Sequence, residues 1–95
     1  MSLLPHELLH ERLASLGGWR LVGNAIERTF DRSDFNGSIH FVNAIAAAAN
    51  AADHHPDLSI SWNRVTVTLS SHDAGGVTER DLALAKAIDA LAGSA

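Results

Sequence analysis

The stretch DHHPDLSISWNRVTVTLSSHDAGGVTERD, residues 53–81, decides how the rest of the chain is organised. It opens with two adjacent histidines, His54 and His55, followed by Pro56, and it carries a third histidine, His72, after two alternating runs. A residue before proline is pushed towards extended geometry, so the histidine pair is predicted to lie in a loop. A loop and a strand end can then converge on one small pocket.

Two short runs inside this stretch alternate apolar and polar residues. The first run carries Leu58, Ile60 and Trp62, and the second, over residues 64–70, has a valine or leucine at every second position. Such alternation is typical of strands with one buried face. We therefore predict a hairpin with a tight turn near Asn63-Arg64, and we expect Trp62 to belong to the core rather than to a substrate site.

Helical periodicity flanks these strands on both sides. The first predicted helix starts near Pro5, ends at Gly17 and places leucines 9, 13 and 16 on one face. The second runs from Asn36 to about Ala52, after capping residues at 33–36, with an apolar stripe at Ile39, Val42, Ile45, Ala46 and Ala49. The third begins at a capping box formed by Thr78 and Asp81 and ends at Gly93, with a stripe at Leu82, Ala85, Ile88 and Leu91.

Residues 19–22 and 25–32 are predicted to form another hairpin around Gly23-Asn24. The predicted order is helix, strand, strand, helix, strand, strand, helix. Short connections between these elements indicate an α+β fold, with a four-stranded antiparallel sheet and three helices packed on one face. Ninety-five residues are enough for one domain and too few for two, so residues 1–95 are expected to form a single domain.

Composition narrows the possible partners. The net charge is -4 and the seven basic residues are scattered, which argues against a nucleic-acid surface. The absence of cysteine excludes disulfides and thiolate chemistry. No apolar run approaches the roughly 20 residues of a membrane span, and no basic-then-apolar signal is seen at the N-terminus. We expect a cytoplasmic protein that binds neither nucleic acid nor membrane.

The three histidines of the central stretch suit proton transfer. A neutral imidazole accepts a proton and an imidazolium donates one, with an unperturbed pKa of about 6.5, so a histidine cluster can hold both forms at neutral pH. Carboxylates at 53, 57, 73 and 81 are available to orient the rings. By itself, Asp81 is explained equally well as a helix-start carboxylate. A zinc site is the alternative, but adjacent residues on an extended loop point in different directions.

The other three histidines have simpler interpretations. His6 and His10 lie one helical turn apart, a spacing that can bind metal, but no third ligand is nearby in the sequence. We therefore expect them to lie on a solvated helix face. His40 is expected on the surface of the second helix.

The spacing of the central stretch resembles the signature of the pterin-4a-carbinolamine dehydratases. His54-His55-Pro56 is followed by five residues to Trp62, nine to His72 and eight to Asp81. The resemblance covers nearly the whole chain, with matching pieces at Gly18-Trp19, Asp34-Phe35, Asn63-Arg64-Val65, Ser71-His72-Asp73 and Arg80-Asp81. The family also shares the predicted order of helices and strands.

The resemblance implies dehydration of a 4a-hydroxytetrahydropterin to the quinonoid dihydropterin, which recycles the cofactor of aromatic amino-acid hydroxylases. It implies proton transfers by His54 and His72, in either order, and binding of the pterin by His55. Contacts to the pterin are implied for Asp53, Ser70 and Ser71, and a supporting role for Asp81.

No cofactor and no metal are implied, and the family forms homodimers and homotetramers. Asn50 stands where the family usually has a charged residue, which bears on the tuning of His54. The alternative is a pterin-binding, dimerisation or transcriptional coactivator module with weak or no catalysis.

Overall fold

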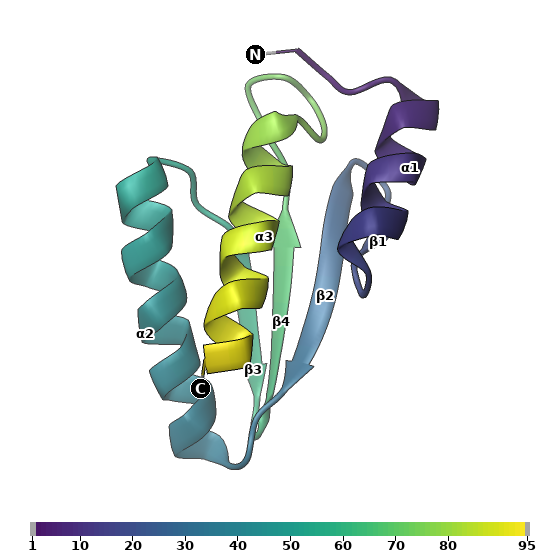
Figure 1. Ribbon diagram of the computed structural model, residues 1–95. Coiled ribbons are helices and arrows are strands. Elements are labelled where there is room, and N and C mark those ends of the chain that lie inside the picture. Colours follow the sequence, from purple (N-terminus) through teal and green to yellow (C-terminus); the bar gives the residue numbers. More distant parts are fainter. Residues whose placement is uncertain (1, 95) are drawn as a thin grey trace.

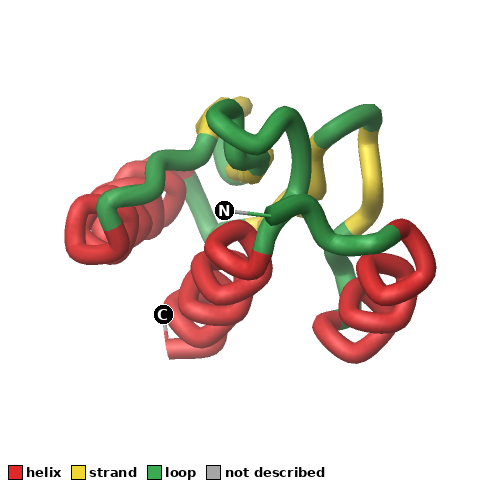
Figure 2. Tube along the Cα trace, turned by 90° about the horizontal axis from the view of Figure 1, so that it is seen from above, coloured by secondary structure: helices red, strands yellow, loops and turns green. Residues whose placement is uncertain are grey.

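A computed structural model describes residues 2–94. The chain forms seven elements (Figure 1), which are α1 (His6–Leu16), β1 (Arg20–Val22), β2 (Ala25–Asp31), α2 (Phe35–Ala52), β3 (Asp57–Ser61), β4 (Arg64–Leu69) and α3 (Glu79–Ser94). The strands form one antiparallel sheet in the order β1-β2-β4-β3. Viewed from above, the three helices lie on the same side of the sheet (Figure 2). The predicted α+β fold is therefore confirmed.

The centre of the sheet joins the two hairpins. β2 pairs with β4 from Ile26 opposite Leu69 to Asp31 opposite Arg64. Both central strands turn fully buried aliphatic side chains towards the helices, at positions 26, 65, 67 and 69. Because β1 and β3 each pair on one side only, they are the edges of the sheet among the described residues.

The helices cover this apolar face as their periodicity predicts, with one correction. Leucines 9 and 13 of α1 and residues 82, 85 and 88 of α3 are buried. In α2, however, the stripe is rotated, because Phe41 packs edge-on against Phe30 with ring centroids 5.1 Å apart. Ile39 is 38% exposed and Ala46 also faces outwards, so the prediction that these two residues are buried was wrong.

The β3–β4 turn also differs from its prediction. Ser61 pairs with Arg64, so the turn consists of Trp62 and Asn63, one residue earlier than expected. Trp62 adopts a positive φ of 52° and is 68% exposed, which corrects its predicted place in the core. The turn is held from outside, since Oγ of Ser38 donates to the Trp62 carbonyl at 2.7 Å and the Arg32 N–H donates to the Asn63 carbonyl at 2.6 Å.

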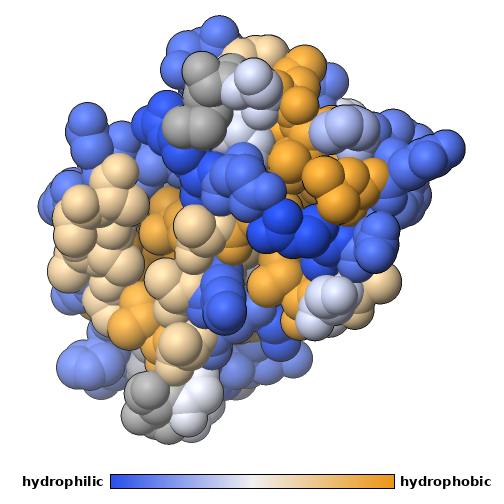
Figure 3. All heavy atoms as spheres, turned by 45° about the horizontal axis from the view of Figure 1, so that its top comes forward, coloured by the Kyte–Doolittle hydropathy of each residue, from blue (hydrophilic) through white to orange (hydrophobic). Residues whose placement is uncertain are grey.

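A shallow apolar hollow of about 510 Å³ runs between α2 and α3. Five alanines, at positions 48, 51, 52, 83 and 87, form most of its walls, and Leu84, His54 and Arg80 also border it. Figure 3 shows the corresponding pale, weakly hydrophobic surface on the side of the molecule where these helices lie. Within residues 2–94, no helix has both the length and the apolar character needed to cross a membrane.

Candidate active site

The position of the histidine pair is set by the way α2 ends. Asp53 follows the helix in the left-handed conformation, with φ 51° and ψ 43°. Its N–H bonds to the carbonyl of Asn50, and the N–H of His54 bonds back to the carbonyl of Ala49 at 3.1 Å. These two bonds are those of a Schellman motif, in which a residue with positive φ reverses the chain and satisfies the last carbonyls of the helix. His54 is therefore fixed by the helix end itself.

The start of α3 forms the other side of the site. The carboxylate of Asp81 accepts the N–H of Thr78 at 2.9 Å, and Oγ1 of Thr78 accepts the N–H of Arg80 at 3.3 Å. This reciprocal pattern is the capping box that the sequence predicted. Oγ of Ser71 donates to the same Asp81 oxygen at 2.8 Å and also contacts Oγ1 of Thr78. Asp81 and Thr78 are fully buried, so the start of α3 is a rigid polar cluster inside the protein.

A contact between His54 and Asp81 connects the end of α2 to the start of α3. Nε2 of His54 lies 2.5 Å from Oδ1 of Asp81, and the two residues are 7% and 0% exposed. When Asp81 is ionised, its carboxylate only accepts hydrogen bonds, and Nε2 of His54 then carries the proton. Nδ1 is then the nitrogen through which His54 can accept or donate a proton. A carboxylate behind an imidazole fixes the tautomer of the ring and stabilises the imidazolium that forms on protonation.

His55 has a different partner. Its Nε2 donates to Oδ1 of Asn50 at 3.0 Å, and the ring is exposed. The sequence argument placed Asn50 beside His54, but the hydrogen bond of Asn50 is to His55. The reason is the reversal at Asp53, which buries His54 beneath the helix end and leaves His55 outside it. An amide at position 50 therefore orients the second histidine, not the first.

His72 lies on a short loop that follows β4. Ser71 and Gly76 form an isolated antiparallel bridge, with the N–H of Ser71 bonded to the Gly76 carbonyl at 2.8 Å. The bridge closes residues 72–75 into a tight turn, in which Gly75 has a φ of 79° that other residues rarely adopt. His72 is exposed at the base of this turn. The turn after β4, and not the strand itself, thus presents the third histidine.

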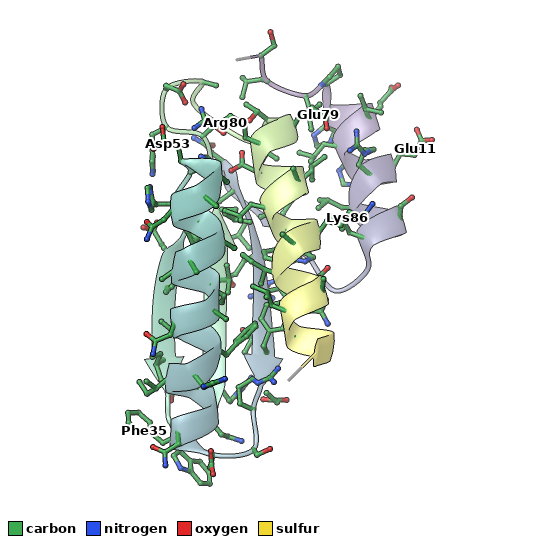
Figure 4. All side chains as sticks on the ribbon, turned by 60° about the vertical axis from the view of Figure 1, so that its left-hand side comes forward. Glu11, Phe35, Asp53, Glu79, Arg80 and Lys86 are labelled. Carbon is green, nitrogen blue, oxygen red and sulfur yellow. The ribbon has the colours of Figure 1, made fainter. Side chains whose placement is uncertain are left out.

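Arg80 ties the two loops together, and the sequence argument did not single it out. Its Nη2 donates to the carbonyl of Asp53 at 3.1 Å, and its Nη1 lies 3.6 Å from the carboxylate of Asp73. In Figure 4, Asp53 and Arg80 lie at the same end of the molecule, where α2 ends and α3 begins. The signal available in the sequence was the Arg80-Asp81 pair among the pieces that resemble the dehydratase family.

These side chains enclose an open pocket of about 260 Å³. Its walls are formed by Asp53, His54, His55, Ser70, His72, Asp73 and Arg80. Five of the seven residues predicted for the site line this pocket, and Asp81 contacts one of them, His54. Ser71 differs from Asp53 and Ser70, because its side chain is buried against Asp81 and does not face the cavity. Within residues 2–94, no group of three or more histidine or acidic side chains is arranged to hold a metal ion.

Three histidines at the edge of one polar pocket provide proton donors and acceptors from different directions. One ring is backed by a buried carboxylate, one by an amide, and one is open to solvent. Such a site can move protons on a small bound molecule without a covalent intermediate. The fold and the pocket together define a small α+β domain with a histidine-lined polar pocket.

Comparison with known proteins identifies the class. A family model described as pterin 4 alpha carbinolamine dehydratase matches residues 2–91. A relative from Thermosynechococcus vestitus that carries the provisional name pterin-4-alpha-carbinolamine dehydratase is 56% identical over 84 residues, which are 88% of each chain. A similarly named relative from Acidobacterium capsulatum is 48% identical over 96% of this chain and 99% of its own. The chain belongs to the pterin-4a-carbinolamine dehydratase family.

Two solved structures share the fold. The structure of a transcriptional coactivator/pterin dehydratase from Brucella melitensis superposes with a TM-score of 0.90 at 39% identity, covering 95% of this chain and 98% of that one. A pterin dehydratase-like protein identified as a RuBisCO assembly factor in the alpha-carboxysome gives a TM-score of 0.71 at 27% identity, over 82% and 93% of the two chains. The same architecture therefore occurs in proteins described by different roles.

Proposed function

We propose that this chain dehydrates 4a-hydroxytetrahydropterin to quinonoid dihydropterin and so recycles the pterin cofactor of aromatic amino-acid hydroxylases. In this reaction the C4a–O bond breaks, the hydroxyl takes up a proton and leaves as water, and N5 loses a proton. The proton count therefore closes without a redox partner. The observation that supports the proposal best is the contact between His54 and the buried Asp81, at the edge of a pocket that also contains His55 and His72.

The two proton transfers are assigned to His54 and His72. Asp81 stabilises the positive charge that His54 gains on accepting a proton, so His54 is the better candidate for the base that deprotonates N5. His72 is exposed at the opposite loop and is assigned to protonate the leaving hydroxyl. General acid–base help of this kind is typically worth about 10²–10⁴ in rate.

The remaining residues are assigned to binding the pterin or to supporting the site. His55, held by Asn50, is assigned to orienting the pterin, and Asp53 and Ser70 line the pocket where ring nitrogens and exocyclic groups would bind. Ser71 acts through Asp81, because its hydroxyl is bonded to that carboxylate. Arg80 holds the two loops at a fixed separation.

The test is a direct assay of 4a-hydroxytetrahydropterin dehydration, measured above the uncatalysed rate. The parent chain and a His40→Ala control on the exposed face of α2 should both be active. His72→Ala should lose most of the rate with an unchanged thermal midpoint, because His72 is exposed and outside the core. Dialysis against a chelator should leave the rate unchanged. No acceleration by the parent chain would overturn the proposal, and full activity of His72→Ala would overturn the assignment of His72.

A second candidate is a pterin-binding or interaction module with weak or no catalysis. It is favoured by the two solved relatives whose descriptions name a coactivator and an assembly factor, and by the uncharged Asn50 beside His55. Pterin binding by calorimetry together with no rate acceleration would select this candidate. Rate acceleration that depends on His54 and His72 would exclude it.

A further inference from the structure

Two histidines outside the pocket point their rings at each other. His6 and His10 are one turn apart on α1, and both are exposed. Their Nε2 atoms lie 3.0 Å apart, and the rings meet edge to face with centroids separated by 4.4 Å. This arrangement plays no part in the dehydration proposed above.

Two ring nitrogens at this distance share one proton in an N–H···N hydrogen bond. In the neutral pair, one Nε2 must carry a proton and the other must accept it. Both Nε2 atoms therefore lie on the same exposed face of α1, close enough for one ion to contact both. A metal ion that replaces the shared proton can bind both nitrogens without a rearrangement of the helix.

Residues 6–10 read His-Glu-Leu-Leu-His. Two histidines at this spacing lie on one helix face and are the pair that holds zinc in a known class of metallopeptidases. Those sites need a third protein ligand, and within residues 2–94 no group of three candidate ligands is arranged around a metal position. The geometry therefore supports a two-ligand chelate and not a peptidase site.

The nitrogen ligands, more than their separation, favour particular metals. With metal–nitrogen bonds of about 2.0 Å, two nitrogens 3.0 Å apart subtend an angle of about 95° at the ion. That angle is near the angle between adjacent positions of a square-planar or octahedral ion, and a small rotation of the exposed rings would also give the nitrogen separation of about 3.3 Å that tetrahedral zinc needs. Cu²⁺ and Ni²⁺ prefer the former geometries, and Cu²⁺ binds nitrogen ligands most tightly in the divalent series.

We propose that His6 and His10 form a surface chelate for Cu²⁺, and more weakly for Ni²⁺, with water in the remaining positions. The positive end of the helix dipole opposes a cation here, and the carboxylates of Glu7 and Glu11 on the same helix offset it. The pair is also freer to bind than the site histidines, because Nε2 of His54 is bonded to Asp81 and Nε2 of His55 to Asn50.

The chelate would bridge the first turn of α1. That turn begins after Pro5, and no side chain caps it. Because the ion binds both histidines only when the turn is helical, it stabilises the folded protein by mass action. The thermal midpoint should therefore rise by several degrees with Cu²⁺ in the parent chain.

The test uses the full chain without a histidine tag, titrated with Cu²⁺ alone and then Ni²⁺ alone. Calorimetry should give one site per chain, and the electron paramagnetic resonance spectrum of Cu²⁺ should show two coordinated nitrogens. His6→Gln and His10→Gln should each lower the affinity by at least tenfold. His40→Gln and His72→Gln should leave it unchanged.

Two double variants with the same number of histidines test whether Cu²⁺ binding depends on the spacing of the histidines along α1. His6→Gln with Ala14→His puts the two imidazoles at positions 10 and 14, again one turn apart, and should restore binding. His10→Gln with Ala14→His leaves them at positions 6 and 14, about 12 Å apart along the helix, and should not. Ala14 is exposed, so neither change disturbs the core. Equal Cu²⁺ affinity in the two double variants, or loss of the site only in His72→Gln, would overturn the proposal.

Discussion

Nε2 of His54 and Oδ1 of Asp81 lie 2.5 Å apart, although 27 residues separate them in the chain. The histidine is positioned by the end of α2 and the carboxylate by the start of α3. The contact therefore depends on how these two helices are placed on the sheet. Substitutions at the end of α2 and at the start of α3 can therefore test the two sides of the contact separately.

Asp81→Asn should lower both activity and stability. The amide keeps the shape of the side chain but turns an NH₂ group towards groups that all donate, so a buried donor loses its acceptor or His54 changes tautomer. We expect a rate loss of at least about 10² and a loss of about 1–3 kcal/mol in the free energy of unfolding. Initial rates, urea denaturation and ¹⁵N NMR of the imidazole measure these effects. Asp57→Asn, which changes an exposed residue of β3, is the control. If Asp81→Asn keeps the full rate while the tautomer of His54 changes, His54 is not the base.

Asp53→Gly should separate stability from binding. Asp53 has a φ of 51°, which glycine adopts without a steric penalty, so the free energy of unfolding should stay constant or rise by up to about 1 kcal/mol. The side chain also lines the pocket, so KM for the pterin should rise. Denaturation curves and steady-state kinetics of the same preparations provide the comparison. A destabilised variant with an unchanged KM would contradict both parts.

Asn50→Glu should act on His55. A carboxylate at this position stabilises the imidazolium form of the ring it contacts, so NMR should show His55 titrating at higher pH than in the parent chain. His54 should be little affected, because its partner is Asp81. Asn43→Glu adds the same charge two turns earlier on the exposed face of α2 and serves as the control. A response of His54 larger than that of His55 would show that position 50 acts mainly on His54, and not through its contact with His55.

Arg80 is expected to matter through its geometry more than through its charge. Its guanidinium reaches Asp53 and Asp73 at once, and a lysine ammonium is less able to span both. Arg80→Lys and Arg80→Gln should therefore both lower kcat/KM by roughly tenfold, with little change in stability, since the side chain is a third exposed. Arg20→Gln, at an exposed ion pair on β1, is the control. Full activity of Arg80→Lys would mean that charge alone is needed.

The chain is expected to associate with itself. The sheet ends in two edge strands, and Phe35, Ile39 and Trp62 expose 50%, 38% and 68% of their surfaces. Unpaired edges and exposed apolar side chains are commonly covered by another subunit. Sedimentation at micromolar concentration should show a homodimer or homotetramer, and Ile39→Glu should weaken it while Ala14→Glu does not. A stable monomer of the parent chain would count against this expectation.

Much of the fold could be predicted because local rules and tertiary packing agree. The caps at Asp34 and Thr78, the alternation in β4 and the stripe of α3 all lie where their patterns place them. Trp62 could not be placed in this way, because its position depends on Ser38 and Arg32, which hold the turn from distant parts of the chain. Periodicity contains no information about such contacts.

The candidate site, like the fold, could be predicted only in part. The spacing of the histidines indicated that His54, His55 and His72 would meet, and they border one pocket. Which partner each ring takes could not be predicted, because a single left-handed residue at Asp53 decides that His54 turns inwards to Asp81 and His55 outwards to Asn50. Arg80 was missed because a helical first turn gives no indication of the direction in which a long side chain points.

The capping box at the start of α3 has a consequence for comparing relatives. Thr78 and Asp81 would be kept by selection for a stable helix start even in a protein that no longer performs chemistry. Finding this aspartate in a distant homologue is therefore weak evidence of catalysis. His72 has no such structural role, because its side chain is exposed and backbone bonds close the turn that carries it. Under the proposed function, the loss or retention of His72 is therefore the more informative marker of catalysis in a relative.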